Sequence, residues 1–230
     1  MEIGFDLISD FNFDTVENFN WQGKATSLYC LIAGNVSKNS KTTLHVLNEF
    51  STNYHGVFYV PGPLEFINKT SISDYNELLN ASLQKLNNVV LLHHNVIVID
   101  KIAIVGVTGW AGNVPLELND KEVLEAGYND LLYLHSTIQK LQKHIDVKTI
   151  IIVTNSVPNR ELYYKEEPDI VYHQLPLVSA LSGDTEGKVK YWVFGNHDKL
   201  IDTKIETISY YNNPYLNRDP YYPKRISITD

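Results

Sequence analysis

The chain has 230 residues, of which 43% are hydrophobic and 20% are charged, and its formal net charge at pH 7 is -8. This size and composition are typical of a soluble α/β protein, and we expect residues 1–230 to form a single domain. The acidic balance argues against nucleic acid as a partner. No apolar stretch approaches the roughly 20 residues that cross a bilayer, and no signal peptide is apparent, so we expect a cytoplasmic protein without a membrane partner.

Strands and helices are predicted to alternate along the chain. Short apolar runs predict strands at residues 3–9, 28–33, 56–60, 89–92, 96–99, 102–107, 149–153 and 191–194. Helical spacing predicts helices at residues 40–54, 73–86, 120–145 and 175–181, and the third is expected to break or kink near Gly127. Asp100 and Lys101 suit a tight hairpin turn. This pattern predicts two packed sheets flanked by helices.

Five segments have the same form, an apolar run that ends in a short polar cluster. In chain order they read LISDFN at 7–12, IAGN at 32–35, VPGPLE at 60–65, IVTNS at 152–156 and WVFGNHD at 192–198. This series resembles the calcineurin-like metallophosphoesterase family, whose blocks read D-x-H, G-D, G-N-H-D/E, H and G-H-x-H. Residues 89–110 and the tail from Asn213 to Pro223 extend the resemblance. It implies an α/β fold of two packed mixed β-sheets flanked by α-helices.

The resemblance also implies a two-metal site. In this chain, most of the positions that hold its first cation, and the position of its bridging ligand, carry other residues than in the family. In the family, one metal is held by the Asp and His of the first block and the last His of the fifth. Those positions are Asp10, Asn12 and Asp198. The Asp that bridges both metals is replaced by Asn35. An amide offers one neutral oxygen, so it is a poor bridge between two dications.

The residues that hold the second metal and supply the general acid in the family are replaced more extensively. The positions of the second metal's ligands are Pro63, Asn155 and Asn196. Proline has no side-chain ligand, and the histidine that would protonate the leaving group is replaced by Leu64, which cannot transfer a proton. We therefore predict a vestigial active site without catalytic residues.

Two descriptions of this vestigial site remain open from sequence. In the first, the asparagines form a polar network without metal, and no cofactor is expected. In the second, a single hard cation, Mg²⁺, Mn²⁺ or Ca²⁺, is held by Asp10, Asn12, Asn35 and Asp198, because such ions accept ligation by oxygen alone. His93 and His94 lie between two strand runs and are predicted to form a surface turn.

The expected function is that of an inactive phosphoesterase-like protein that acts as a protein-binding or assembly module, with a protein partner or a second copy of itself. One alternative is a one-metal phosphoesterase, phosphodiesterase or nuclease. Another is a sensor that binds a nucleotide or phosphate in the former cleft. A tyrosine-rich tail is either packed on the sheet edge or exposed as a contact surface. Its rings are Tyr210, Tyr211, Tyr215, Tyr221 and Tyr222.

Overall fold

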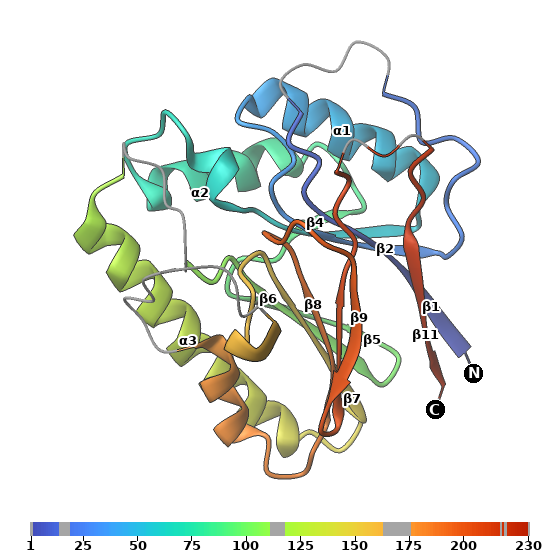
Figure 1. Ribbon diagram of the computed structural model, residues 1–230, viewed down its shortest axis with the longest axis vertical. Helices are drawn as coiled ribbons and strands as arrows, with labels where there is room; N and C mark the ends of the chain where they lie inside the picture. Colours follow the sequence, from blue (N-terminus) through green and yellow to red (C-terminus); the bar gives the residue numbers. More distant parts are fainter. Residues whose placement is uncertain are drawn as a thin grey trace.

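The computed structural model describes residues 2–13, 19–110, 118–162, 176–216, 218 and 220–229. A first sheet has the strand order β11-β1-β2-β3-β4. Its strands are β1 (Glu2–Ile8), β2 (Tyr29–Ala33), β3 (Gly56–Val60), β4 (Val89–Leu91) and β11 (Lys224–Thr229). The first four are parallel, and β11 pairs antiparallel with β1, so the two ends of the chain lie side by side (Figure 1).

The second sheet has the strand order β5-β6-β7-β8-β10-β9. Its strands are β5 (Asn95–Ile99), β6 (Ile102–Val107), β7 (Thr149–Thr154), β8 (Val189–Phe194), β9 (Ile201–Ile205) and β10 (Ile208–Asn212). The central strands β6, β7, β8 and β10 are parallel, whereas β5 and β9 run antiparallel at the two edges. Both sheets are therefore mixed, as predicted.

Helices cover the outer faces of the two sheets (Figure 1). The long helices are α1 (Ser40–Asn53), α2 (Ile72–Leu83) and α3 (Asp120–Gln142), and the short 3-10 turns are η1 (Pro63–Phe66), η2 (Arg160–Leu162) and η3 (Leu177–Gly183). Buried residues of α1 and α2 pack on the first sheet together with Val123 of α3, and the later buried residues of α3 and those of η3 pack on the second. The predicted fold class is confirmed.

The core between the sheets follows from the alternation of side chains along each strand. On β1, Phe5 and Leu7 face the second sheet, while Ile8 packs under α1. On β2, Leu31 faces inward and Ile32 faces the helices. Because both faces of these strands are largely buried, their sequences are rich in apolar residues, which is why the strands were predictable.

The structure corrects several predicted boundaries. Helix α2 ends at Leu83, before the predicted end at Leu86. Leu86 packs on the core from the loop that follows the helix. Helix α3 runs through Gly127 without interruption and ends at Gln142. The β5–β6 hairpin is confirmed, with Asp100 in its turn at φ 55°. Strands β9, β10 and β11 were not predicted.

Among the described residues, no helix is long and apolar enough to span a membrane.

Candidate functional site

The five segments meet where the parallel strands of both sheets end. The backbone N–H of Asp10, after β1, donates to Gly34 O after β2 at 3.0 Å. Within the same sheet, Asn35 Nδ2 donates to Asp10 Oδ1 at 2.9 Å. Asn196, after β8, donates its backbone N–H to the same oxygen at 2.9 Å. The structure therefore brings Asp10, Asn35 and Asn196 together.

These three residues share an unusual backbone conformation. Asp10, Asn35 and Asn196 have φ angles of 54°, 55° and 53°, in the left-handed region. Asn and Asp tolerate this region better than other residues that carry a side chain beyond Cβ, since their short polar groups hydrogen-bond locally. Each turn aims a polar side chain from a strand end into the same space.

The orientation of the Asn35 amide does not suit a bridging metal ligand. Its oxygen accepts from the Leu64 backbone N–H at 3.1 Å, and its nitrogen faces Asp10 and lies 3.5 Å from Asn196 Oδ1. A cation needs an oxygen in this place, because an amide nitrogen has no free lone pair to donate. These residues do not fit a two-cation site.

The side chain of Asn155 fills the space between three glycines. It is fully buried, and its Nδ2 donates to Ala33 O at 2.7 Å. A Cβ atom added at Gly34, Gly62 or Gly195 would lie within 2.8 Å of an atom of this side chain. Asn155 thus ties the end of β7 to the end of β2. Asn35, which accepts from the Leu64 backbone, and Asn155 thus both hydrogen-bond backbone groups near the strand ends.

The remaining site positions predicted from sequence do not join this cluster as ligands. The side chain of Asp198 is 68% exposed. Asn12 is also exposed, and its amide donates to Asp10 O at 3.3 Å. Pro63 is buried and Leu64 is half-buried at the start of η1. The four-oxygen cation site predicted from Asp10, Asn12, Asn35 and Asp198 is therefore not assembled.

Glu65 is the polar group that sequence reasoning missed. Its carboxylate is 0% exposed and accepts four hydrogen bonds from three segments. The donors are the backbone N–H groups of Asn35, Val36 and Gly62 and the hydroxyl of Tyr59. Burial raises its pKa to about 7, against the lowering effect of these donors. The signal was present, since Glu65 stands at the D/E position of the third block.

Asp10 is a buried carboxyl with one satisfied oxygen. Its Oδ1 accepts from Asn35 and Asn196, whereas Oδ2 has no hydrogen-bond partner among the described residues. Burial raises its pKa to about 6, although those hydrogen bonds lower it. A proton on Oδ2 would neutralise the group without breaking either bond.

We expect Asp10 to make the protein less stable as the pH rises. The carboxyl ionises near pH 3.8 when exposed and at about 6 in the fold, so between these values the folded state binds more protons. The free energy of unfolding should fall across this window, by roughly 2–3 kcal/mol in total. Asp10→Asn mimics the protonated group and keeps both bonds. Urea denaturation should show the variant more stable than wild type at pH 8 and similar at pH 4; parallel pH profiles would contradict this.

Removing the amide of Asn155 should destabilise the fold. Asn155→Ala leaves Ala33 O unpaired in a buried place, which costs roughly 1–3 kcal/mol. Asn80→Ala, on the exposed face of α2, is the matched control and should melt at or slightly above the wild-type temperature. Equal melting of the two variants would show that the Asn155 bond contributes nothing to stability.

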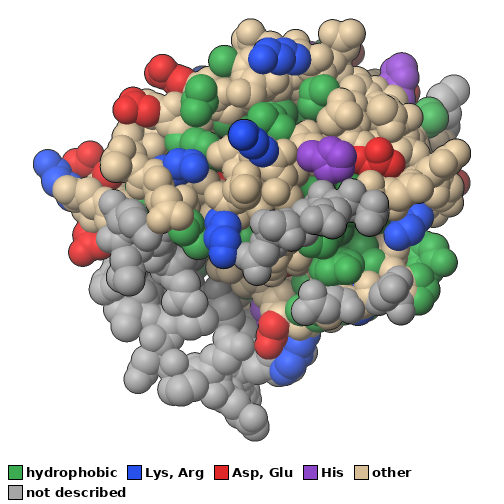
Figure 2. Space-filling model, turned by 90° about the horizontal axis from the view of Figure 1, so that it is seen from above, with side chains coloured by type: hydrophobic (Ala, Val, Ile, Leu, Met, Phe, Trp, Pro, Cys, Tyr) green, Lys and Arg blue, Asp and Glu red, His purple; other side chains and the backbone are tan. Residues whose placement is uncertain are grey.

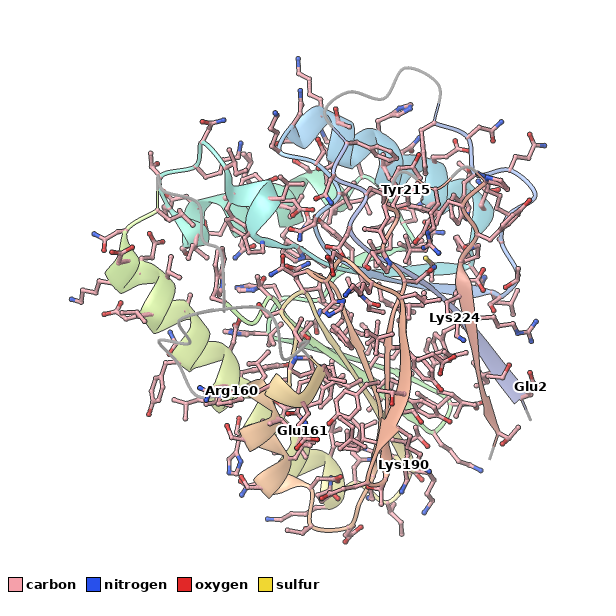
Figure 3. All side chains as sticks on the ribbon, viewed as in Figure 1. Glu2, Arg160, Glu161, Lys190, Tyr215 and Lys224 are labelled. Atoms are coloured by element: carbon pink, nitrogen blue, oxygen red, sulfur yellow. The ribbon has the colours of Figure 1, made fainter. Side chains whose placement is uncertain are left out.

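The tyrosine-rich tail mostly packs within the chain. Tyr210 and Tyr221 are buried, Tyr211 and Tyr215 are half-buried, and Tyr222 is 60% exposed. Tyr215, labelled in Figure 3, packs against Phe11, Phe13 and Tyr221. Only Tyr222 thus presents most of its ring to solvent.

Neither a protein-family model nor a curated protein matches the chain. Solved structures do match it. A phosphopantetheinyl hydrolase from Mycobacterium tuberculosis superposes with a TM-score of 0.65 at 15% identity, over 98% of this chain and 96% of that one. This chain has a phosphoesterase-type fold. At this identity the likeness shows the fold alone.

Two further structures share this fold. A Staphylococcus aureus protein assigned as a 5′-nucleotidase, solved with α-ketoglutarate, gives a TM-score of 0.62 at 10% identity; the match covers 100% of this chain but only 51% of that one. GAP50, the anchor in the inner membrane complex of Plasmodium, gives 0.53 at 14% identity, over 93% of this chain and 71% of the other. The fold is that of the calcineurin-like metallophosphoesterases.

Proposed function

We propose that this protein is a catalytically inactive phosphoesterase-like chain that acts as a protein-binding or assembly module. The observation that carries the proposal is the contact between Asn35 and Asp10. In this contact an amide N–H of Asn35 points where a bridging ligand would present an oxygen to a cation. The same amide uses its oxygen on the backbone of Leu64. The strand ends are held together by protein groups rather than by metal.

The chemistry of the third block supports the same proposal. Leu64 stands where the family has its proton donor, and an aliphatic side chain cannot deliver a proton to a leaving group. Loss of a general acid alone typically lowers the rate by about 10²–10⁴-fold. Pro63, the neighbouring ligand position, carries no donor atom.

A role in assembly is supported by one structural neighbour and by the surface. GAP50, which shares the fold, is an anchor in a membrane-associated complex. Tyr222 exposes most of its ring, and tyrosine is enriched at protein interfaces. On the face seen in Figure 2, the described Lys and Arg side chains are scattered singly instead of forming a basic patch, which favours a protein partner over nucleic acid.

The first test is hydrolysis of aryl phosphate mono- and diesters with Mn²⁺, Mg²⁺, Ni²⁺ or Zn²⁺. We expect no turnover above that of an Asp10→Ala preparation purified in the same way. Metal-dependent turnover that Asp10→Ala abolishes would overturn the proposal.

Such a result would instead support the second candidate, a one-metal phosphoesterase. One specific observation favours this rival: Asp10 Oδ2 and Asn155 Oδ1 are buried and lack hydrogen-bond partners among the described residues. Oxygen atoms without partners could ligate a hard cation.

The second test concerns the partner. A photo-reactive amino acid placed at Tyr222 should cross-link a discrete protein, or a second copy of the chain, in the native extract. The same group at Ile145, which is 79% exposed at the far end of α3, is the control. Equal labelling from both positions would remove the tail from the interface.

A further inference from the structure

A second cluster of metal-ligating side chains lies outside the vestigial site. His93 and His94 stand in the loop between β4 and β5, and Asp130 projects from the middle of α3. One potential ligand atom from each residue lies within 4.8 Å of the other two. His94 Nε2 and Asp130 Oδ1 are already 2.6 Å apart. From these positions we infer that His93, His94 and Asp130 form a binding site for one divalent transition-metal ion of the zinc type.

The free atoms of the cluster are those that a cation needs. His93 Nδ1 is buried and has no hydrogen-bond partner among the described residues. The ring nitrogen of His94 and the carboxylate oxygen of Asp130 face each other across a short hydrogen bond, so a cation at the cluster would take the place of that bond. Two imidazoles and one carboxylate suit zinc, nickel or copper, whereas Mg²⁺ and Ca²⁺ prefer oxygen ligands alone.

The polar atoms of these residues that would not bind the metal contact neighbouring groups. In known metal sites, such outer contacts orient the ligands. Asp130 Oδ2 accepts from the Gly109 N–H at 2.7 Å, which leaves Oδ1 for the cluster. The Nε2 of His93 lies 3.4 Å from Asn76 Nδ2. The ring of His94 is stacked on Tyr133, with centroids 4.7 Å apart. The ligand residues are thus partly preorganised.

Closing the cluster on an ion requires a small movement. Donor atoms around a tetrahedral zinc ion lie about 3.3 Å apart, so the most separated pair must approach by at most about 1.5 Å. The two histidine rings are stacked at 4.6 Å with an angle of 13° between their planes. Because the lone pair of a ring nitrogen lies in the plane of the ring, both histidine side chains must rotate for their nitrogens to point at one ion.

The proposed site keeps one coordination position open. It has three protein ligands, and the side chain of His94 is 33% exposed. Closed structural zinc sites use four protein ligands, whereas three ligands leave room for water or an incoming group. The proposed site shares no residue with the vestigial one, although the two are neighbours: Thr108 O accepts from the backbone of Asn155, and the next residue, Gly109, donates to Asp130. The inference therefore does not depend on the proposed function.

Calorimetric titration of the chelator-treated full chain with ZnCl₂ tests the site. We expect one zinc ion to bind per chain, and His93→Gln or His94→Gln to weaken binding at least about tenfold. His45→Gln, an exposed histidine on α1, is the matched control and should bind like wild type. Asp10→Asn should also bind normally, which separates this site from the vestigial one.

Two results would overturn the inference: no zinc binding by wild type, or zinc binding that both histidine variants retain. If His93→Gln does not fold, the half-exposed His94 still decides the question. Cobalt provides a second measurement on unmutated protein, because Co²⁺ with few ligands absorbs far more strongly in the visible than the hexa-aqua ion. A spectrum identical to that of free cobalt would contradict the site.

Discussion

Replacing Glu65 with glutamine is expected to lower the free energy of unfolding by about 1–3 kcal/mol for each buried N–H group left without an acceptor. One carboxylate oxygen accepts from the Val36 N–H and the Tyr59 hydroxyl, and the other accepts from the N–H groups of Asn35 and Gly62. A glutamine NH₂ group that faces Asn35 and Gly62 meets two N–H donors. If it faces Val36 and Tyr59 instead, the hydroxyl can turn to accept from it, but the Val36 N–H loses its acceptor. The variant therefore leaves at least one buried N–H group without an acceptor.

Glu77→Gln is the matched control for this experiment. Glu77 is exposed on α2, and the same change there should alter stability by no more than about 0.5 kcal/mol. Urea denaturation followed by circular dichroism compares the two variants with wild type. If Glu65→Gln unfolds at the wild-type midpoint, the carboxylate does not hold β2, β3 and η1 together as we describe.

Gly195→Ala should cost about 3 kcal/mol or more, because a Cβ atom at this position would lie 2.1 Å from Ala33 O and 2.8 Å from Asn155 Nδ2. The nearer obstacle is backbone, which cannot rotate away, so the end of β8 must move from the end of β2. This joint sets the position of Asn196 relative to Asp10.

A glycine in open space supplies the comparison. A Cβ atom at Gly23 would meet nothing within 4 Å, and only its φ of +75° opposes a side chain. Gly23→Ala should thus cost about 1–2 kcal/mol. Thermal melts of both variants would decide the matter, and an equal loss from the two changes would mean that the two sheets tolerate separation at this joint.

The sequence allowed the strands with short apolar runs to be predicted, including β4 and β5 at sheet edges, but not β9, β10 and β11. Strands β2 and β3 are buried on both faces and therefore read as continuous apolar runs. By contrast, β9 has exposed polar residues at its centre, and β11 alternates between buried Ile226 and Ile228 and exposed neighbours. Such half-buried strands carry a weaker signal, and pairing with residues distant in the sequence decides their structure.

The candidate site shows the same division. The order of the five segments predicted which strand ends lie together, and the structure confirms that Asp10, Asn35 and Asn196 meet. The order of the segments did not predict that Asn12 and Asp198 are exposed to solvent, because the direction of a side chain depends on the turns at the strand ends, several of which have positive φ. His93 and His94 do form a loop, but their contact with Asp130 was not foreseeable, since that residue lies on a helix 36 residues after His94.

We propose that protein hydrogen bonds, and not cations, hold the former active site together. Crystals grown with Mn²⁺ test this proposal through an anomalous difference map. We predict no manganese peak within bonding distance of Asp10, and electron density in which Asn35 contacts Asp10 and the Leu64 backbone. A manganese ion bound to Asp10 Oδ2, with the amide of Asn35 turned to present its oxygen, would contradict the account.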